Sequence, residues 1–195
     1  AGAGLALGLV GTWFGQDAWA AAGGGVGLIG AILYLGLMAV TLRQRMRKKL
    51  GPAFILLGLS WALMPLSLLL AIAWALDLLP AWGGVIFALW LFGWLLGFLL
   101  AVLQRIVPFL ASMHAALSVR RRPPTVTALT ASGPLAAHLY CHCAALVMLS
   151  AGIIWPMPFL VSLGALAGLL GAASFAWFFL LAVLKYRRAV APPPA

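Results

Sequence analysis

Five long apolar segments, separated by short polar or charged stretches, constrain this 195-residue chain more than any other feature of its sequence. A helix needs about 20 predominantly apolar residues to cross a bilayer, and each segment approaches or exceeds that length. The chain is 66% hydrophobic and 7% charged, so a single soluble core could not bury its apolar surface. The sequence predicts an all-α, polytopic transmembrane helix bundle with five full spans, at roughly Gly25 to Leu42, Ala53 to Leu79, Gly84 to Leu117, Leu135 to Trp155 and Pro158 to Leu184.

The residues before the first span contain a shorter apolar stretch, Ala1 to Phe14, which covers about half the length of a span. We interpret it as a partial N-terminal span. A cleaved signal peptide is the alternative, although no basic region precedes it. The predicted organisation is a single transmembrane domain over residues 1–195, with the partial span and an outer loop at 1–23, the helix bundle at 24–189 and an exposed proline-rich tail at 190–195.

Basic residues give the chain a formal net charge of +10, and most of them lie in three short clusters. The clusters follow the first, third and fifth spans, at Arg43 to Lys49, Arg120 to Arg122 and Lys185 to Arg188, and therefore lie on one side of the membrane. By the positive-inside rule this side, with the C-terminus, is cytoplasmic. The clusters are therefore topology signals and not a nucleic-acid surface, and the Arg-, Ala- and Leu-rich composition indicates a bacterial inner membrane. The opposite connections carry Asp17, Trp74, Asp77, Trp82 and Trp155 without Lys or Arg.

Small residues in two spans allow close approach of helices, which matters in lipid because apolar burial does not drive helix association there. One interpretation is an interface with another subunit, and the other is packing within this chain. Pro65 and Pro108 should bend the second and third spans. The small residues are Gly93 and Gly97 in the third span, and Gly164, Gly168, Gly171, Ala172 and Ser174 in the fifth.

Polar side chains at membrane depth are functional candidates because their burial in hydrocarbon is costly. The third span contains Gln104, Arg105 and His114 near its cytoplasmic end. We expect Arg105 to be the deepest cation of the chain. Its side chain could bind the carboxylate of a cofactor or a substrate, or it could extend to lipid phosphates or a neighbouring subunit.

Two of the three histidines and both cysteines fall within residues 138–143 of the fourth span. At 100° per residue, His138, Cys141 and His142 share one helix face, while Tyr140 and Cys143 point elsewhere. His114 should lie at a comparable depth on the preceding span. The three histidines are therefore predicted to bind a cofactor, with His138 as the first ligand and His142 or His114 as its partner.

The cofactor indicated by these residues is haem or a metal ion such as copper, because imidazole suits both and Cys141 could add a soft ligand. A haem held between helices is the form the sequence favours. The alternative is a structural or lipid-facing polar cluster, since no carboxylate lies near to orient the imidazoles. A disulfide between Cys141 and Cys143 is not expected, because the two side chains project to different faces and the compartment is reducing.

The segment LWLFGWLLGFLLAVLQRIVPFLASMH resembles a helix pattern in subunit I of the haem-copper oxidase superfamily, especially its cbb3-type and nitric-oxide-reductase-like members. The matching positions are Gly93, Trp94 and Pro108. The resemblance implies a shortened relative, a respiratory-type membrane complex, and haem or copper as the cofactor. It carries no ligand of that family onto a numbered residue here, and the family's adjacent histidine pair is absent.

The function predicted from the sequence is an integral membrane subunit of a respiratory-type redox complex that binds haem or metal through His114, His138 and His142. The alternative is an accessory subunit without a cofactor, which braces a larger complex. A transporter fits less well, because Asp17 and Asp77 lie outside or at the end of the spans. No phosphate loop, dinucleotide turn or nucleophile elbow is present, so catalysis by this chain alone is not expected.

Overall fold

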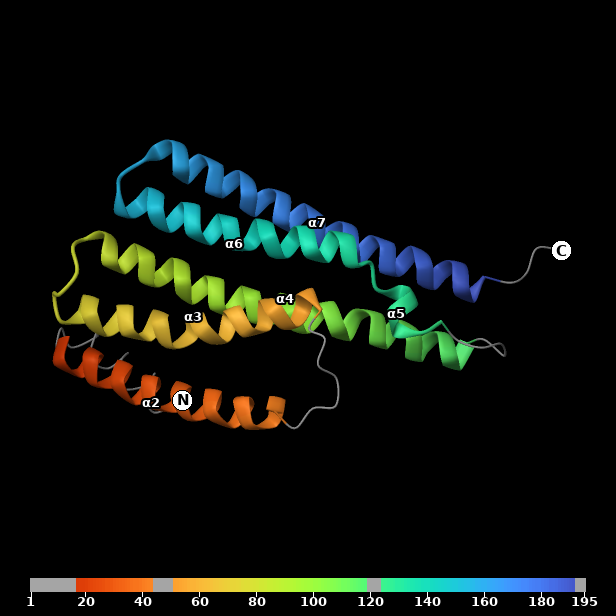
Figure 1. The fold of residues 1–195 in the computed structure, drawn as a ribbon, viewed down its shortest axis with the longest axis horizontal. Coiled ribbons are helices and arrows are strands. Elements are labelled where there is room, and N and C mark those ends of the chain that lie inside the picture. Colours follow the sequence, from red (N-terminus) through yellow and green to blue (C-terminus); the bar gives the residue numbers. More distant parts are fainter. Residues whose placement is uncertain (1–16, 44–50, 119–123, 192–195) are drawn as a thin grey trace.

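The computed structural model describes residues 17–43, 51–118 and 124–191, and these residues form helices without any strand. Five helices are long and apolar enough to span a membrane, which confirms the predicted all-helical bundle and indicates a multi-pass membrane protein. The partial span predicted at Ala1 to Phe14 lies outside the described residues. With the labels of Figure 1, the helices are α2 (Asp17–Arg43), α3 (Pro52–Ala75), α4 (Trp82–Ser118), α5 (Val126–Leu129), α6 (Ser132–Ile154) and α7 (Pro158–Val190).

Helix ends differ from the prediction in several places, and α3 ends at Ala75 although the second span was predicted to reach Leu79. Residues 17–23, predicted as an outer loop, belong to α2, because their alanine-rich sequence favours helix. The connection between α4 and α6 contains the one-turn helix α5, where the Thr125 side chain accepts a hydrogen bond of 3.3 Å from the Ala128 amide. Finally, α7 continues through the basic cluster Lys185–Arg188, whose long side chains reach away from the helix without interrupting it.

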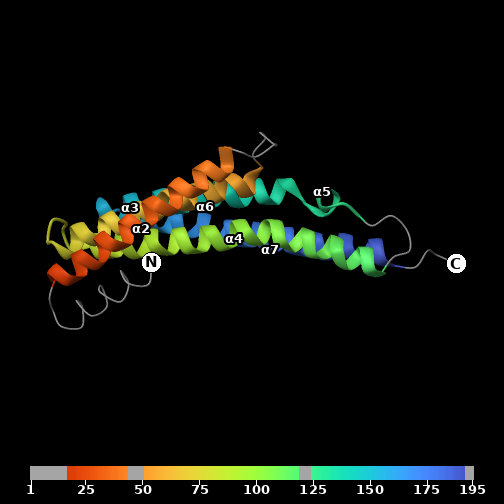
Figure 2. The ribbon, with the colours of Figure 1, turned by 90° about the horizontal axis from the view of Figure 1, so that it is seen from below.

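In Figure 1 the helices follow one another in the order α2, α3, α4, α6 and α7, and the view turned by 90° shows α4 and α7 in one layer and α3 and α6 in another (Figure 2). The hairpin partners α3 and α4 pack together, as do α6 and α7, and α4 joins the two hairpins by contacting both α6 and α7. Among the described helices α2 contacts α3 alone. In its apolar stretch only 6% of the residues are buried, against 22% in the corresponding stretches of α3, α4 and α6. The candidate site must therefore lie among α3, α4, α6 and α7.

The long helices α4 and α7 continue together beyond the ends of α3 and α6, as both views show (Figures 1 and 2). They contain 37 and 33 residues, which exceeds the length that a span requires. The α5 segment packs against this extension. The Ser112 hydroxyl of α4 donates to the Pro124 carbonyl at 2.8 Å, and the Lys185 ammonium of α7 donates to the Ala128 carbonyl at 2.9 Å. The segment that contains α5 therefore packs along α4 before α6 begins at Ser132.

Glycines bring α6 and α7 together within this chain. A Cβ built on Gly164 would lie 2.8 Å from Leu149 Cγ and 3.0 Å from the Leu149 backbone nitrogen. A Cβ on Gly171 would lie 3.2 Å from Cys141 Cβ. The helices α4 and α6 are also close, because a Cβ on Gly93 would lie 2.7 Å from Leu146 Cδ2. Of the two interpretations of the small residues, packing within the chain accounts for these glycines.

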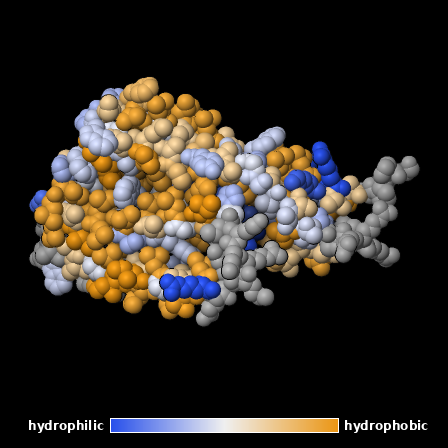
Figure 3. Space-filling view, in the orientation of Figure 1, coloured by the Kyte–Doolittle hydropathy of each residue, from blue (hydrophilic) through white to orange (hydrophobic). Residues whose placement is uncertain are grey.

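Hydrophobic side chains cover much of the face seen in Figure 3. Large apolar side chains on α2 are widely exposed, including Ile29 at 62% and Leu37 at 66%. Basic residues lie in the last turns of α2 and α7, where Figure 3 shows strongly hydrophilic side chains. Lipid can solvate such a surface, whereas water could not without promoting association.

Candidate functional site

His138 is a buried histidine whose orientation is fixed by the backbone of a neighbouring helix. Its side chain is 2% exposed, and its Nδ1 lies 3.0 Å from the Gly171 carbonyl oxygen of α7. A carbonyl oxygen only accepts hydrogen bonds, so Nδ1 must donate. In the neutral ring, Nε2 then carries the free lone pair. This is the tautomer in which a histidine binds a metal through Nε2 while a carbonyl holds the other nitrogen.

His142 stands one helical turn further along α6, and its ring lies beside that of His138. The two ring centroids are 5.8 Å apart, with an angle of 33° between the ring planes. Among the described residues, neither Nε2 atom has a hydrogen-bond partner, and both atoms are buried. A buried polar atom without a partner costs about 1–3 kcal/mol. A bound ligand would satisfy these two Nε2 atoms. His138 and His142 lie side by side, as their predicted shared helix face indicated.

The two histidines line a hollow of about 210 Å³ between α4, α6 and α7. The remaining walls are aliphatic, aromatic or glycine, so the imidazoles are the polar groups of the hollow. On one side Phe175 lies against His138, with ring centroids 5.4 Å apart. The wall residues are Leu89, Phe92, Gly93, Leu96, Leu100, Ala145, Leu146, Leu149, Gly168, Gly171 and Ala172.

Ser60 of α3 approaches His142 across Gly97 of α4, and neither Ser60 nor Gly97 lines the hollow. A Cβ built on Gly97 would lie 2.6 Å from Ser60 Oγ and 3.4 Å from His142 Nε2. The absence of a side chain at Gly97 therefore gives both atoms room to approach the same point. Ser60 is 1% exposed, and its hydroxyl donates to the Leu56 carbonyl at 2.8 Å, which leaves oxygen lone pairs available.

His114 does not join His138 and His142, contrary to the predicted convergence of three histidines. It lines a separate hollow of about 250 Å³ between α4 and α7, and its Nδ1 lies 3.0 Å from the Leu110 carbonyl oxygen. His142 lies beside Gly97, and Gly97 is roughly 25 Å from His114 along α4 at about 1.5 Å per residue. The prediction assumed that α4 and α6 meet the membrane surface at equal depth, whereas α4 extends past the start of α6.

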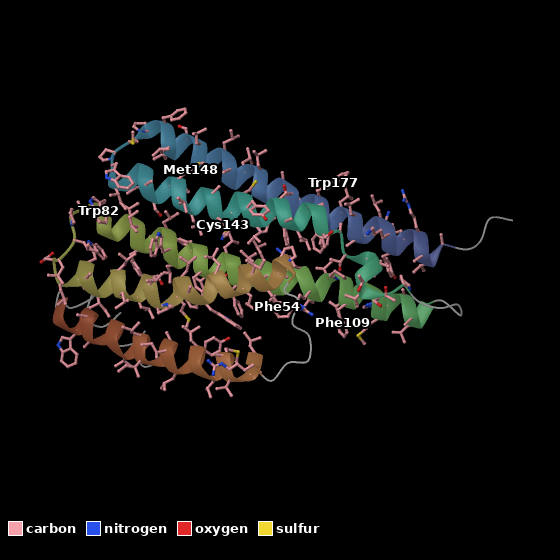
Figure 4. The ribbon with its side chains drawn as sticks, in the orientation of Figure 1. Phe54, Trp82, Phe109, Cys143, Met148 and Trp177 are labelled. Atoms are coloured by element: carbon pink, nitrogen blue, oxygen red, sulfur yellow. The ribbon has the colours of Figure 1, made fainter. Side chains whose placement is uncertain are left out.

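The cysteines do not line this hollow. Cys141 faces Gly171 of α7 at the contact described above, and Cys143 packs against a cluster of Leu56, Ala101 and Leu139. Figure 4 labels Cys143 on α6 beside α4. Both thiols are free. The structure therefore does not bring Cys141 to the two Nε2 atoms as a third ligand.

Arg105 also lies away from the hollow. Its guanidinium carbon is 4.3 Å from the centre of the Phe54 ring, in the first turn of α3, and its side chain is exposed. Phe54 marks the end of α3 beside α4 in Figure 4. Arg105, predicted to be the deepest cation, therefore lies beside the N-terminal turn of α3. Its neighbour Gln104 is 2% exposed, and neither of its amide atoms has a partner among the described residues.

The arrangement thus offers two imidazole nitrogens from α6 and one nearby hydroxyl from α3. Among the residues that the structure describes, no group of three or more His, Cys, Asp or Glu side chains could hold a metal ion. Sequence reasoning did not identify Ser60 or the Gly171 carbonyl. A serine within an otherwise apolar span is a usable signal, but a backbone carbonyl has no signature in the sequence.

Comparisons with protein-family models, curated proteins and solved structures find no match to this chain. The functional argument therefore depends on the geometry of this site.

Proposed function

We propose that this chain is a membrane subunit of a respiratory-type redox complex, and that it binds a haem or a metal ion through Nε2 of His138 and Nε2 of His142. The bound group would transfer electrons while the protein supplies its ligands and excludes water. The partners of the chain are other membrane subunits and lipid.

The observation that carries this proposal is the pair of buried, unpartnered Nε2 atoms on two neighbouring histidines that line one hollow, with His138 oriented by the Gly171 carbonyl. A structural histidine would use both ring nitrogens in hydrogen bonds, since an unsatisfied buried nitrogen is destabilising. A ligand histidine leaves one nitrogen for the metal and fixes the ring through the other. The helical sequence resemblance to subunit I of the haem-copper oxidases adds support for a respiratory context.

The proposed orientation places the basic ends of α2 and α7 in the cytoplasm of a bacterial cell, with the chain in the inner membrane. Support comes from Arg43, Arg187 and Arg188 in the last turns of these helices. The connection after α3 carries Asp77 and would face the periplasm.

Spectroscopy of the purified protein tests the redox proposal. The chain is extracted from its native membrane in mild detergent, and reduced-minus-oxidised absorption spectra are recorded together with metal analysis. We expect about one haem or one redox-active metal ion per chain, absent from a His138→Leu/His142→Leu variant of equal helix content. A wild-type protein without haem and without stoichiometric copper, iron or zinc would contradict the proposal.

An accessory subunit without a cofactor is the second candidate, and the exposed surface of α2 favours it. Since α2 contacts α3 alone among the described helices, most of its apolar surface is free to bind lipid or another membrane helix. The two candidates differ in one result. An accessory subunit would assemble normally and keep the activity of its complex after His138 and His142 are both replaced, whereas a cofactor subunit would lose a redox centre.

A further inference from the structure

We infer that the hollow between α4 and α7 that His114 lines, here called the α4–α7 groove, binds one anionic phospholipid. An acyl chain lies along its apolar walls, and the headgroup phosphate lies at Arg187. This groove is separate from the hollow lined by His138 and His142, so the inference does not depend on the proposed function. Three observations carry it: the order of apolar and polar residues along the groove, the charge at its end, and the length of its two helices.

The α4–α7 groove changes from apolar to polar along its length. Its volume is about 250 Å³, and the described residues that line it belong to α4 and α7 alone. Both helices run towards the basic end of the bundle, where α2 and α7 end (Figure 1). The polar lining residues His114 and Tyr186 therefore lie at the basic end of the groove. An amphiphile whose head points to that end matches this order. The apolar walls are Val107, Leu110, Ala111, Phe179, Ala182 and Val183.

The groove is open on one side. Leu110 is 47% exposed and Phe179 is 49% exposed, whereas Ala182 is 1% exposed and forms the floor. The segment around α5 is bonded to Ser112 and Lys185, and at about 100° per residue both of these point away from the groove. That segment therefore packs on another side of the two helices. A lipid from the surrounding membrane can enter the groove sideways.

The charge at the end of the groove selects an anionic headgroup. Arg187 follows Tyr186 and lies four residues after Val183, so its exposed side chain shares a helix face with that wall residue. The two acidic residues of the chain, Asp17 and Asp77, begin α2 and follow α3, at the opposite end of the bundle. No carboxylate side chain of this chain therefore competes with a phosphate for Arg187. Basic pockets between membrane helices bind the headgroups of anionic lipids.

The length of α4 and α7 explains why lipid is held here. At about 1.5 Å per residue they are roughly 55 Å and 50 Å long, whereas a bilayer with its headgroups is about 40–45 Å thick. Spanning segments that are too long tilt or thicken the bilayer locally. The groove begins at Val107, two residues after Arg105, which lies beside the N-terminal turn of α3. Its apolar walls therefore extend past the start of α3, and a phospholipid held at Arg187 raises its chain to cover them.

Lipid titration followed by native mass spectrometry tests the inference. The full chain is freed of endogenous lipid in detergent and titrated with phosphatidylglycerol, and in parallel with phosphatidylcholine of the same acyl chains. We expect one phosphatidylglycerol per chain, bound at least about fivefold more tightly than phosphatidylcholine. Arg187→Gln should weaken phosphatidylglycerol binding by about fivefold, the effect of one basic residue near an anionic lipid, and should leave phosphatidylcholine binding unchanged.

Two matched controls separate the groove from non-specific binding. Arg188→Gln removes the same charge one residue further, on the side of α7 that points away from the groove, and should leave the affinity nearly unchanged. Ala111→Phe fills the groove and should weaken phosphatidylglycerol binding by about 10-fold or more. Ala116→Phe, on the opposite face of α4, should bind lipid as the wild type does. Circular dichroism checks the helix content, and the exposed Arg187→Gln keeps the test valid where Ala111→Phe does not fold.

Four results would overturn the inference. They are equal affinity for the two lipids, a preference for phosphatidylglycerol that persists in Arg187→Gln, and full competition by soluble glycerol phosphate, which would mean that the site takes a free anion. The fourth is a photo-crosslinker at position 111 that captures a protein in native membranes, which would mean that another subunit occupies the groove. Because His138 and His142 lie elsewhere, each of these results leaves the proposed function intact.

Discussion

At the scale of single residues, the site depends on two imidazoles held inside an apolar bundle. His138 has the stronger positional constraint, because the Gly171 carbonyl fixes its tautomer and ring direction. His142 lies beside Gly97, where a Cβ would be 3.4 Å from its Nε2, an ordinary contact, but 2.6 Å from Ser60 Oγ of α3. The approach of Ser60 therefore requires glycine at position 97.

Replacing Gly97 by alanine should disturb the site without disrupting the fold. The new methyl group would lie 2.6 Å from Ser60 Oγ, so the Ser60 side chain must move, and it would lie at an ordinary 3.4 Å from His142 Nε2. We expect cofactor affinity to fall by about 10–100-fold, the range seen when groups that orient ligands are altered. Gly58→Ala is the control, because a Cβ there meets nothing within 4 Å. If both variants bind cofactor equally well, Gly97 has no role at the site.

At the scale of helices, the two hairpins form by different contacts. The α6–α7 hairpin uses close backbone approach at Gly164 and Gly171. Between the hairpins, the Trp90 indole nitrogen of α4 donates to the Ser150 hydroxyl of α6 at 2.9 Å. In lipid, such close packing and interhelical hydrogen bonds replace the hydrophobic effect as the source of helix association.

Two neighbouring glycines on α7 should respond differently to alanine. Gly164→Ala would place a methyl group 2.8 Å from Leu149 Cγ and 3.0 Å from the Leu149 backbone nitrogen, and the backbone cannot yield as a side chain can. We expect the free energy of unfolding in detergent to fall by about 1–3 kcal/mol. Gly168→Ala would meet Ala145 Cβ at an ordinary 3.8 Å and should change stability by less than about 1 kcal/mol. Equal effects would argue against close α6–α7 packing at Gly164.

Helix identity could be predicted from the sequence, but helix register could not. Apolar length alone identifies five spans, because a bilayer imposes a minimum length on any spanning helix. The shared face of His138 and His142 follows from the helical repeat within one element. The expected meeting with His114 failed because it required the relative depth of α4 and α6. That depth depends on the extension of α4 and on the α5 segment, and both follow from packing between helices.

At the scale of the whole molecule, the bundle has one strongly basic end and one end with tryptophans and Asp77. The exposed apolar surface of the described helices between these ends suits lipid. The extension of α4 and α7 lies at the basic end, with α5 packed against it. This polarity supplies the basis for the proposed orientation.

Labelling of single cysteines tests that orientation. In a background with Cys141→Ala and Cys143→Ala, Leu78→Cys and Arg188→Cys are introduced at exposed positions on opposite ends of the bundle. A membrane-impermeant maleimide should label Leu78→Cys in intact spheroplasts and Arg188→Cys only after lysis. The reverse pattern would mean that the basic end faces outwards.

X-ray absorption spectroscopy of the bound metal tests the central claim, that Nε2 of His138 and Nε2 of His142 are its ligands. The claim predicts imidazole scattering around the metal of the wild-type protein at about 2.0 Å. The same edge should lose this scattering in His138→Leu/His142→Leu and retain it in His114→Leu. A metal whose spectrum shows no imidazole, or shows the same imidazole scattering in the double variant, would contradict the account.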